Sequence, residues 1–170
     1  MQVLEGIKII ELVHMPPGEL CSMILGDFGA DIVKIEAVTQ SSERKLVDPA
    51  EAEALKSLMA FNAMNRNKKS IRINLKSEDG KEVFYKLAKE ADVVIEGFRP
   101  GVAKRMGVDY QTVNKLNPRI VYCSLSGYGQ DGPYSQHPGH DINYISIDGA
   151  LNLIGWPGSP PPIPLSLIHI

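Results

Sequence analysis

The alternation of short apolar runs with helical segments constrains the fold of this chain more than any other feature of its sequence. Residues 8–12 (KIIEL) and 31–36 (DIVKIE) are typical of short buried strands. The segment between them begins with Pro16 and Pro17, carries apolar residues at helical spacing, and meets Gly29, which can end a helix in the left-handed conformation. A strand, a helix and a second strand joined in this way pair in parallel. The sequence therefore predicts the α/β class, with a Rossmann-like, doubly wound parallel sheet.

The same alternation continues along the rest of the chain. Further strands are expected at 71–75, 92–98 and 119–126, and further helices at 77–91, 101–107, 110–117 and 140–155. Ser77 is placed to cap the 77–91 helix, whose apolar face carries Val83, Phe84 and Leu87. Residues 37–69 are polar and irregular apart from one Ala-rich helical piece at 49–64. No internal repeat is visible, and we expect one α/β domain over residues 1–164.

The charge balance argues against a nucleic-acid partner. The 170 residues carry a formal net charge of −2, whereas nucleic-acid binding needs a clustered basic face. One run, 65–72 (NRNKKSIR), holds four basic residues. It leaves two alternatives open, which are a solvated charged face and contacts with small anionic groups such as phosphates.

The sequence also predicts a cytoplasmic protein. No apolar run reaches the length of a membrane span, so no membrane partner is expected. The N-terminal residues include acidic residues and prolines where a signal peptide needs a continuous apolar core. Cys21 and Cys123 are isolated thiols without metal-ligand spacing, and we expect them to be buried and reduced. No metal site is predicted.

Loops after the strands should carry the ligand site, because ligands bind at the carboxyl edge of such sheets. His14 follows the first strand and is assigned to a loop without a special role. Arg99 follows the 92–98 strand, with Pro100 and Gly101 after it. It is placed either to close that turn or to meet an anion.

His140 ends a Gly-rich loop, 127–139, at the start of the predicted 140–155 helix. The positive end of a helix dipole favours a neutral, basic imidazole. The backbone N–H groups of Asp141 and Ile142 would be free to bind a developing oxyanion. Such a pairing suits removal of a proton alpha to a carbonyl. The alternative is that His140 only caps the helix or packs the loop.

Four stretches, taken in order, resemble the CaiB/BaiF-type family III coenzyme A transferases. They are GIKIIELVHMPPGELCSMILGDFGADIVKIE, NRNKKSIRINLK, EGFRPGVAKRMGVDYQTVNKLNPRIVYCSLSGYGQDGPY and GHDINYISIDGAL. The resemblance runs from about residue 5 to about residue 164. The family includes formyl-CoA transferase, the carnitine CoA-transferases and alpha-methylacyl-CoA racemase. Within it, GHDINY resembles the racemase branch. The resemblance implies that residues 1–164 are part of an N-terminal CoA-binding α/β domain.

The resemblance also implies roles for particular residues. His140 corresponds to a catalytic base, with the backbone N–H of Asp141 near the thioester oxygen. The thioester end of the site would be lined by Gly139, Asp141, Ile142, Asn143 and Tyr144. The adenosine part of CoA would lie along Arg72, Ile73, Asn74 and Leu75, and Arg99 would lie near the CoA phosphates. No cofactor is implied beyond the CoA moiety of the substrate.

One position departs from the family pattern. Racemases usually have an arginine after the acidic residue of the second strand, where it contacts CoA, and this chain has Ala37 there. The contact is then lost or supplied by a neighbour such as Lys34 or Arg44.

The activity implied is that of a 2-methylacyl-CoA racemase or epimerase, working by alpha-proton transfer through an enolate. The alternatives are a family III CoA-transferase that moves CoA between carboxylic acids, and a non-catalytic CoA-binding fragment. The partner would be a small acyl-CoA molecule. Family members are interlocked homodimers, so the full-length product is expected to be one.

Racemisation needs a second group on the opposite face of the alpha carbon, and in this family that group is an aspartate. Its place in this chain falls at Ile170. Residues 165–170 (LSLIHI) match the translation of CTG TCT CTT ATA CAC ATC, the end of a transposase adapter used in sequencing libraries. We interpret them as a sequencing-adapter artefact, so His169 has no role. We expect the 170-residue chain itself to be inactive, with residues 150–156 and a sheet edge uncovered.

Overall fold

The computed structural model describes residues 2–38 and 62–162. They fall into two compact units, Met1–Leu125 (unit 1) and Ser126–Ile170 (unit 2). Most of the predicted helical piece at 49–64 lies outside the described residues, and its end forms a single 3₁₀ turn, η2 (Ala63–Asn65). Arg44 and residues 165–170 also lie outside them.

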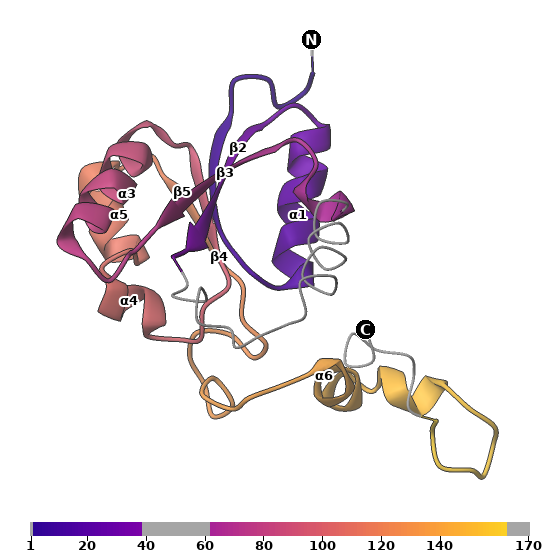
Figure 1. Cartoon of the computed structure of the whole chain (residues 1–170). Coiled ribbons are helices and arrows are strands. Elements are labelled where there is room, and N and C mark those ends of the chain that lie inside the picture. The colour runs from indigo at the N-terminus through magenta and orange to yellow at the C-terminus, as the bar shows by residue number, and fades with distance from the viewer. Residues whose placement is uncertain (1, 39–61, 163–170) are drawn as a thin grey trace, which may run out of the picture. The chain divides into compact units, whose positions relative to one another are not determined.

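Unit 1 is a five-stranded parallel sheet with helices on both faces. Its strands are β1 (Lys8–Leu12), β2 (Asp31–Ala37), β3 (Lys68–Ile73), β4 (Val93–Glu96) and β5 (Val121–Ser124), in the spatial order β3-β2-β1-β4-β5. One face is covered by α1 (Pro16–Asp27), and the other by α3 (Glu78–Glu90), α4 (Val102–Met106) and α5 (Tyr110–Leu116), as Figure 1 shows. The predicted doubly wound parallel sheet is confirmed. The strand order reverses between β1 and β4, which is where such sheets bind ligands.

Alternate side chains of β1, together with Val13 directly after it, supply two separate cores. Ile10 and Leu12 pack with Phe84 of α3, whereas Ile9 and Val13 pack on the α1 side. All five side chains are buried. A central strand buried on both faces accounts for the nearly continuous apolar run of β1.

Local signals fix the start and the buried face of α3. The Ser77 Oγ accepts a hydrogen bond from the Gly80 N–H (3.2 Å), so the predicted cap is confirmed. Phe84 is buried as predicted, but Val83 is 38% exposed, and that part of the prediction is wrong. Only a narrow stripe of α3, with Ala88 one turn after Phe84, faces the sheet, and Val83 lies beside this stripe.

The strand β3 begins three residues before the predicted range of 71–75 and ends two residues before its close. Its bounds follow its ladder with β2, which runs from Ile32 opposite Lys68 to Ala37 opposite Ile73. Lysines do not fit an apolar strand pattern, but β3 is an edge strand in the part of the chain that the structure describes. Backbone pairing therefore sets this strand, not apolar periodicity.

A buried ionic cluster lies between the sheet and α1, and we call it the Glu11 cluster. The Glu11 carboxylate is fully buried and binds the Lys68 ammonium at 2.9 Å and the Ser22 hydroxyl at 2.8 Å. Lys34 lies 4.0 Å from the other Glu11 oxygen and donates to the Glu19 carboxylate at 2.5 Å. Because the residues come from β1, β2, β3 and α1, the cluster ties four elements together.

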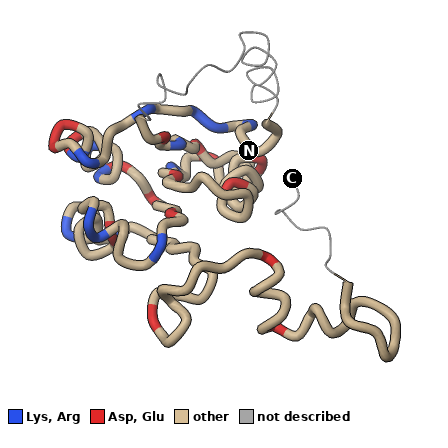
Figure 2. Tube along the Cα trace, turned by 60° about the horizontal axis from the view of Figure 1, so that its bottom comes forward, with Lys and Arg blue, Asp and Glu red and all other residues tan. Residues whose placement is uncertain are grey.

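The basic side chains of the run at 65–72 form ion pairs within unit 1. Besides Lys68, Arg66 binds Asp27 (2.5 Å), Lys69 binds Asp31 (2.7 Å), and Arg72 lies 3.8 Å from Glu36. The hydrogen bond from Arg66 holds the pKa of Asp27 below its ordinary value. Figure 2 shows acidic and basic residues interleaved along unit 1. Three of the four basic residues of the run therefore hold close carboxylates of unit 1, whereas Arg72 has only its long contact with Glu36 among the described residues.

Unit 2 contains α6 (Asp141–Asp148) and a 3₁₀ turn, η3 (Ala150–Leu153). The predicted 140–155 helix is shorter than expected because Gly149 takes a φ of 86°, the left-handed conformation that ends helices. After it, Leu153 and Trp156 are exposed, the latter at 84%.

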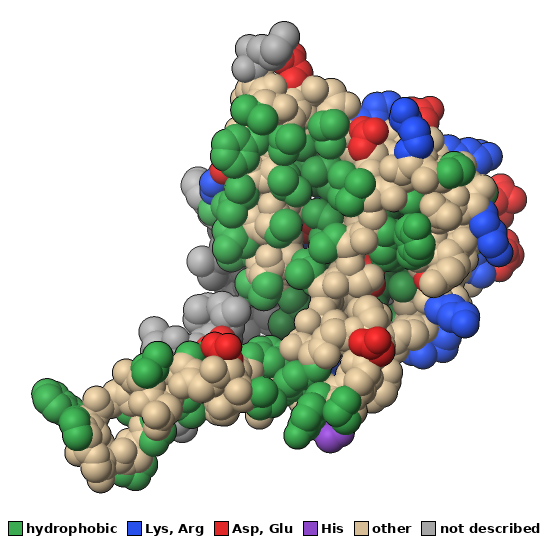
Figure 3. Space-filling model, turned by 180° about the vertical axis from the view of Figure 1, so that it is seen from behind, with side chains coloured by type: hydrophobic (Ala, Val, Ile, Leu, Met, Phe, Trp, Pro, Cys, Tyr) green, Lys and Arg blue, Asp and Glu red, His purple; other side chains and the backbone are tan. Residues whose placement is uncertain are grey.

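Apolar side chains also remain exposed on unit 1. Ile24 of α1 and Val121 of the edge strand β5 are among them, and Figure 3 shows apolar side chains gathered over one face. Within the described residues, Val121 at the β5 edge and residues 152–156 are exposed as expected, whereas Ala150 and Leu151 are partly buried. Among the described helices, none has the length and apolar character needed to cross a bilayer.

Candidate functional site

A pocket of about 600 Å³ opens at the carboxyl edge of the sheet in unit 1. It lies where β1, β2 and β3 end, and a size of this order suits a small organic ligand. Three of the predicted adenosine-site residues lie in it. The lining residues are Leu12, His14, Ile35, Ala37, Val38, Ile73, Asn74, Leu75, Lys76, Phe98 and Met106.

The turn from β3 to α3 forms a rigid wall of this pocket. Ile73 and Leu75 are anchored in the core, and Asn74 lies between them on the exposed side. The Asn74 side-chain oxygen accepts from the Lys76 N–H (3.1 Å), and its carbonyl accepts from the Ser77 hydroxyl (2.8 Å). These two bonds brace the backbone of the turn beside the apolar wall that Ile73 and Leu75 form.

Arg72, predicted along the adenosine part of CoA, and Arg99, predicted near the phosphates, adjoin pocket residues in sequence but do not line the pocket themselves. Arg72 precedes Ile73 and its side chain is 77% exposed. Arg99 follows Phe98 and is also exposed. Its carbonyl accepts from the Val102 N–H (3.0 Å), which closes the predicted turn before α4. Both side chains are open to solvent and to a ligand.

Lys34 and Arg44 were the two residues expected to replace the arginine that is missing at position 37, and the structure tests only Lys34. Ala37 lines the pocket. Lys34 is 5% exposed on the α1 side of the sheet, where it binds Glu19 and Asn65, so it does not supply that contact. Arg44 lies outside the described residues. A cation that sequence patterns missed is Lys76, which does line the pocket.

His14 is a second pocket residue that sequence patterns left without a role. It is exposed and stands two residues after the end of β1. The available signal was its place directly after a strand at the ligand-binding edge, which outweighs its isolation in sequence.

In unit 2, His140 is the N-cap residue of α6. Its backbone N–H donates to the Asn143 side-chain oxygen (2.9 Å), and its carbonyl accepts from the N–H groups of Asn143 and Tyr144. Because α6 begins at Asp141, the N–H groups of Asp141 and Ile142 have no acceptor within the helix. His140 is exposed at the positive end of α6, so an imidazole side chain and N–H groups that have no acceptor within the helix occur together.

The remaining predicted residues of unit 2 surround this helix start. Gly139 packs against the Tyr144 ring, and Tyr144 lies edge-on to Tyr128 with ring centroids 5.1 Å apart. Burial, followed by the nearby Tyr128, raises the pKa of Tyr144. Tyr144 therefore stays a neutral phenol. Ile142, also predicted at the site, has its carbonyl oxygen occupied within the helix, where it accepts a hydrogen bond from the Ser146 hydroxyl (2.5 Å).

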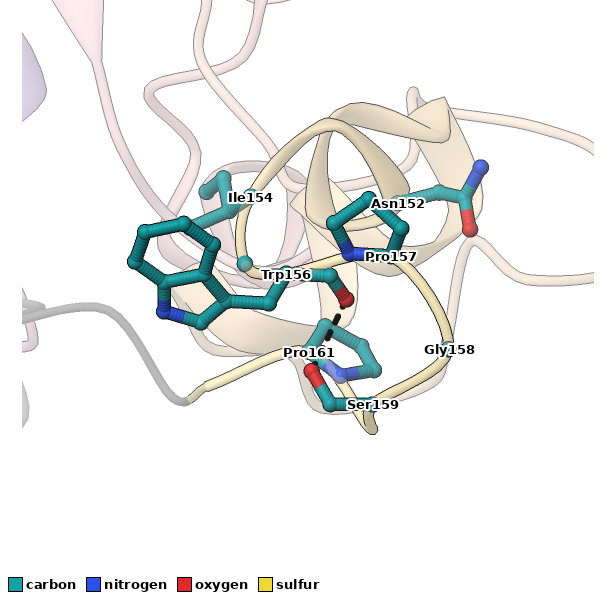
Figure 4. A pocket seen from close by; sticks show the side chains of 8 residues that line it. Asn152, Ile154, Trp156, Pro157, Gly158, Ser159 and Pro161 are labelled. Atoms are coloured by element: carbon teal, nitrogen blue, oxygen red, sulfur yellow. Dashed lines mark hydrogen bonds between the residues drawn. The ribbon is translucent and has the colours of Figure 1, made fainter.

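A second pocket, of about 240 Å³, lies in unit 2 and is drawn in Figure 4. It is enclosed by a turn of consecutive residues, in which the Ser159 hydroxyl donates to the Trp156 carbonyl (2.9 Å). No lining residue carries a titratable side chain; they are Asn152, Ile154, Gly155, Trp156, Pro157, Gly158, Ser159 and Pro161. The lining therefore offers no titratable acid or base, and its one hydroxyl, on Ser159, is held by the Trp156 carbonyl.

The cysteines do not form a nucleophilic site. Cys21 is half-buried, but Cys123 is exposed on β5, so the expectation that both are buried is wrong for Cys123. The edge position of β5 is the reason. Partial burial, and then the nearby Cys21, raise the pKa of the Cys123 thiol, which is the opposite of what a reactive thiolate needs.

Comparisons with known proteins agree with one another. The sequence profile of CoA-transferase family III matches residues 4–168. Alpha-methylacyl-CoA racemase from Mus musculus is 35% identical over 166 residues, which cover 98% of this chain and 39% of that protein. Acetyl-CoA:oxalate CoA-transferase from Acetobacter aceti is 36% identical over 157 residues, which cover 92% of this chain and 40% of that protein.

A solved structure extends the likeness to the fold. A CaiB/BaiF family protein from Brucella suis matches with a TM-score of 0.80 and 32% sequence identity, over 96% of this chain and 44% of that chain. This chain spans about two fifths of the length of the curated relatives it matches. Racemase and transferase are similar to it at the same level of identity.

Proposed function

This chain belongs to CoA-transferase family III, and from that membership we propose that its protein acts on acyl-CoA thioesters. The pocket at the carboxyl edge of unit 1 is assigned to the adenosine end of CoA. Its apolar walls suit an adenine ring, and the Asn74 amide offers a hydrogen-bonding group beside them. His14 and Lys76 supply positive or polar groups at the same rim. CoA enters as part of the substrate, and no further cofactor is proposed.

The CoA phosphates are assigned to the exposed guanidinium groups of Arg72 and Arg99. Planar guanidinium groups bind phosphate through paired hydrogen bonds. Among the described residues, Arg72 has one ion-pair contact, a long one with Glu36 (3.8 Å), so a phosphate can compete for it. Arg66 and Lys69, by contrast, hold close carboxylates and are assigned to the fold.

We propose alpha-proton transfer on 2-methylacyl-CoA, a racemisation or epimerisation, as the reaction. The observation that carries it is the position of His140 at the start of α6, beside free N–H donors. His140 takes the proton from the alpha carbon, and the negative charge moves to the thioester oxygen. The N–H of Asp141 then stabilises the enolate, because the donor is already aimed and needs no reorganisation.

The proton must return on the opposite face of the alpha carbon, and a second acid–base group has to deliver it. We propose an aspartate in the part of the longer protein that the relatives have and these 170 residues do not span. An interlocked homodimer is the proposed assembly of that longer protein, which we place in the cytoplasm.

A CoA-transferase is the second candidate, because a relative of that name is as similar as the racemase. The two reactions separate by their requirements. Exchange of the alpha proton with deuterated water, without any acceptor acid, marks the racemase. Movement of CoA that depends on an added carboxylic acid marks the transferase. Binding of CoA with neither reaction marks the fragment alternative.

The experiment starts by reading the genomic frame beyond codon 164 and expressing the longer product. With 2-methylacyl-CoA in deuterated water, mass spectrometry should show alpha exchange. His140→Asn should slow exchange roughly 100-fold or more while preserving the helix cap, since asparagine caps helices well. His137→Asn, at an exposed loop histidine, is the matched control and should leave exchange unchanged. Exchange that survives His140→Asn contradicts the assignment of the base.

A further inference from the structure

The Gly-rich loop 127–139 contains glycines of two physical kinds. Gly129 and Gly132 have a φ of 87°, a conformation that other residues rarely adopt, and no side chain crowds them. Gly127 and Gly139, at the two ends of the loop, have no such backbone requirement. Another cause must make glycine necessary at these ends.

That cause is one aromatic ring. A Cβ at Gly127 would lie 2.5 Å from Cε1 of Tyr144 and still closer to its hydroxyl oxygen. A Cβ at Gly139 would lie 2.6 Å from the same ring carbon. Real Cβ atoms do not approach other atoms so closely, so either substitution would displace the ring or the loop. Both ends of the loop therefore rest on the Tyr144 ring.

The ring is itself held in place. Tyr128 lies edge-on to it at 5.1 Å between centroids, and Tyr134 lies 5.8 Å from Tyr128. Tyr144 is on the first turn and a half of α6, and its N–H donates to the His140 carbonyl (3.3 Å). Tyr144 is half-buried, and this burial is the first cause of its raised pKa.

We infer that Tyr144 is a positioning residue, whose ring pins both ends of loop 127–139 and so fixes the backbone that presents His140. Gly139 is the residue before His140, so the packing of Gly139 on Tyr144 sets the direction in which the chain enters α6. The inference rests on the proposed function only for what His140 does. The packing of the loop on the ring stands independently of any reaction.

The test is a double-mutant cycle in the 170-residue chain. The variants are Gly127→Ala, Tyr144→Ala and their combination, and the readout is the rate of chymotrypsin cleavage after Tyr134, within the loop. Each single change should speed cleavage roughly tenfold or more by freeing the loop. The combination should match Tyr144→Ala alone, because alanine at 127 has no ring left to displace.

Gly132→Ala is the matched control, since it strains the backbone without meeting any neighbour. Its effect should multiply with that of Tyr144→Ala. Tyr144→Phe keeps the ring and should keep the loop protected. If Gly127→Ala speeds cleavage by the same factor with and without the Tyr144 ring, the inference is overturned. Circular dichroism of each variant shows whether unit 1 stays folded.

A second readout follows His140 directly. The proton NMR signal of its imidazole Cε1–H, assigned by its loss in His140→Asn, should move in Tyr144→Ala and stay in place in Tyr144→Phe. An unchanged signal in Tyr144→Ala overturns the positioning role. Both readouts are independent of alpha-proton exchange, so their failure is distinct from failure of the proposed function.

Discussion

Replacing Lys68 by methionine should destabilise unit 1 strongly, because it leaves the buried Glu11 carboxylate without its closest cation. The Lys68 and Glu11 side chains are 2% and 0% exposed, and their charged atoms lie 2.9 Å apart. At that separation and an effective dielectric constant of about 20, the Coulomb attraction is about 6 kcal/mol. The free-energy cost of removing both charges from water offsets a large part of this attraction. Breaking one side of a buried pair costs about 3–5 kcal/mol.

The neighbours of Glu11 do not remove this cost. Ser22 contributes one hydrogen bond from a neutral hydroxyl, which does not balance the charge of the carboxylate. Lys34 is 4.0 Å away and already binds Glu19, so it is not free to move to Glu11. We therefore expect Lys68→Met to lower the free energy of unfolding by about 3 kcal/mol or more, measured by urea denaturation followed by circular dichroism.

Two further variants make the reasoning refutable. Lys69→Met removes the neighbouring ion pair with Asp31, whose side chains are 71% and 47% exposed, and should cost less than about 1 kcal/mol. Glu11→Gln combined with Lys68→Met removes both charges and should be more stable than Lys68→Met alone. Equal losses for Lys68→Met and Lys69→Met would show that burial of the Glu11 cluster does not govern its energetics.

Three other changes test local features of unit 1. Gly80→Ala should lower the free energy of unfolding by about 1–3 kcal/mol, although such a change usually stabilises a helix, because the new Cβ would overlap the Asn74 carbonyl; a gain in urea denaturation would contradict this. Cys123 should react with iodoacetamide more slowly at pH 8 than a free cysteine peptide despite its exposure, since its pKa is raised, and an equal rate would count against that shift. Burial, and then the charge of Glu96, raise the pKa of Tyr122, so the stability due to its neutral phenol should be complete below about pH 10 and fall as the pH rises further; absorbance at alkaline pH should show this tyrosine ionising after the exposed ones.

Much of the fold could be predicted from local pattern. The apolar run of β1, the two prolines at the start of α1 and the Ser77 cap each carry their structure in a few neighbouring residues. The course of β3 could not be predicted in the same way, because its lysines join the sheet through the backbone ladder with β2 and through ion pairs with Glu11 and Asp31, 38 residues or more away in sequence. A glutamate inside an otherwise apolar strand was the one signal of a buried cation partner.

The candidate site likewise contains residues that could be predicted from the sequence and residues that could not. The turn at 73–75 could be assigned from its resemblance to a family, and the structure shows it lining a pocket at the edge that the sheet topology dictates. Lys76 and His14 were missed because a single charged residue in a loop has no periodic pattern. Lys76 and His14 line the pocket because neighbouring strands end beside them, and that arrangement is visible only in the folded sheet.

The glycines of loop 127–139 show why the rest of the site could not be predicted from the sequence. In sequence, Gly132 and Gly127 are equivalent members of one Gly-rich loop, but the first allows a turn and the second makes room for a ring. The difference matters for chemistry, because a turn glycine can be moved or replaced by changes elsewhere in the loop. A side chain at Gly127 would instead have to displace the Tyr144 ring, which is on the helix that His140 begins. The position of His140, the candidate base, then depends on a steric contact between Tyr144, four residues later in α6, and Gly127, thirteen residues earlier in the chain.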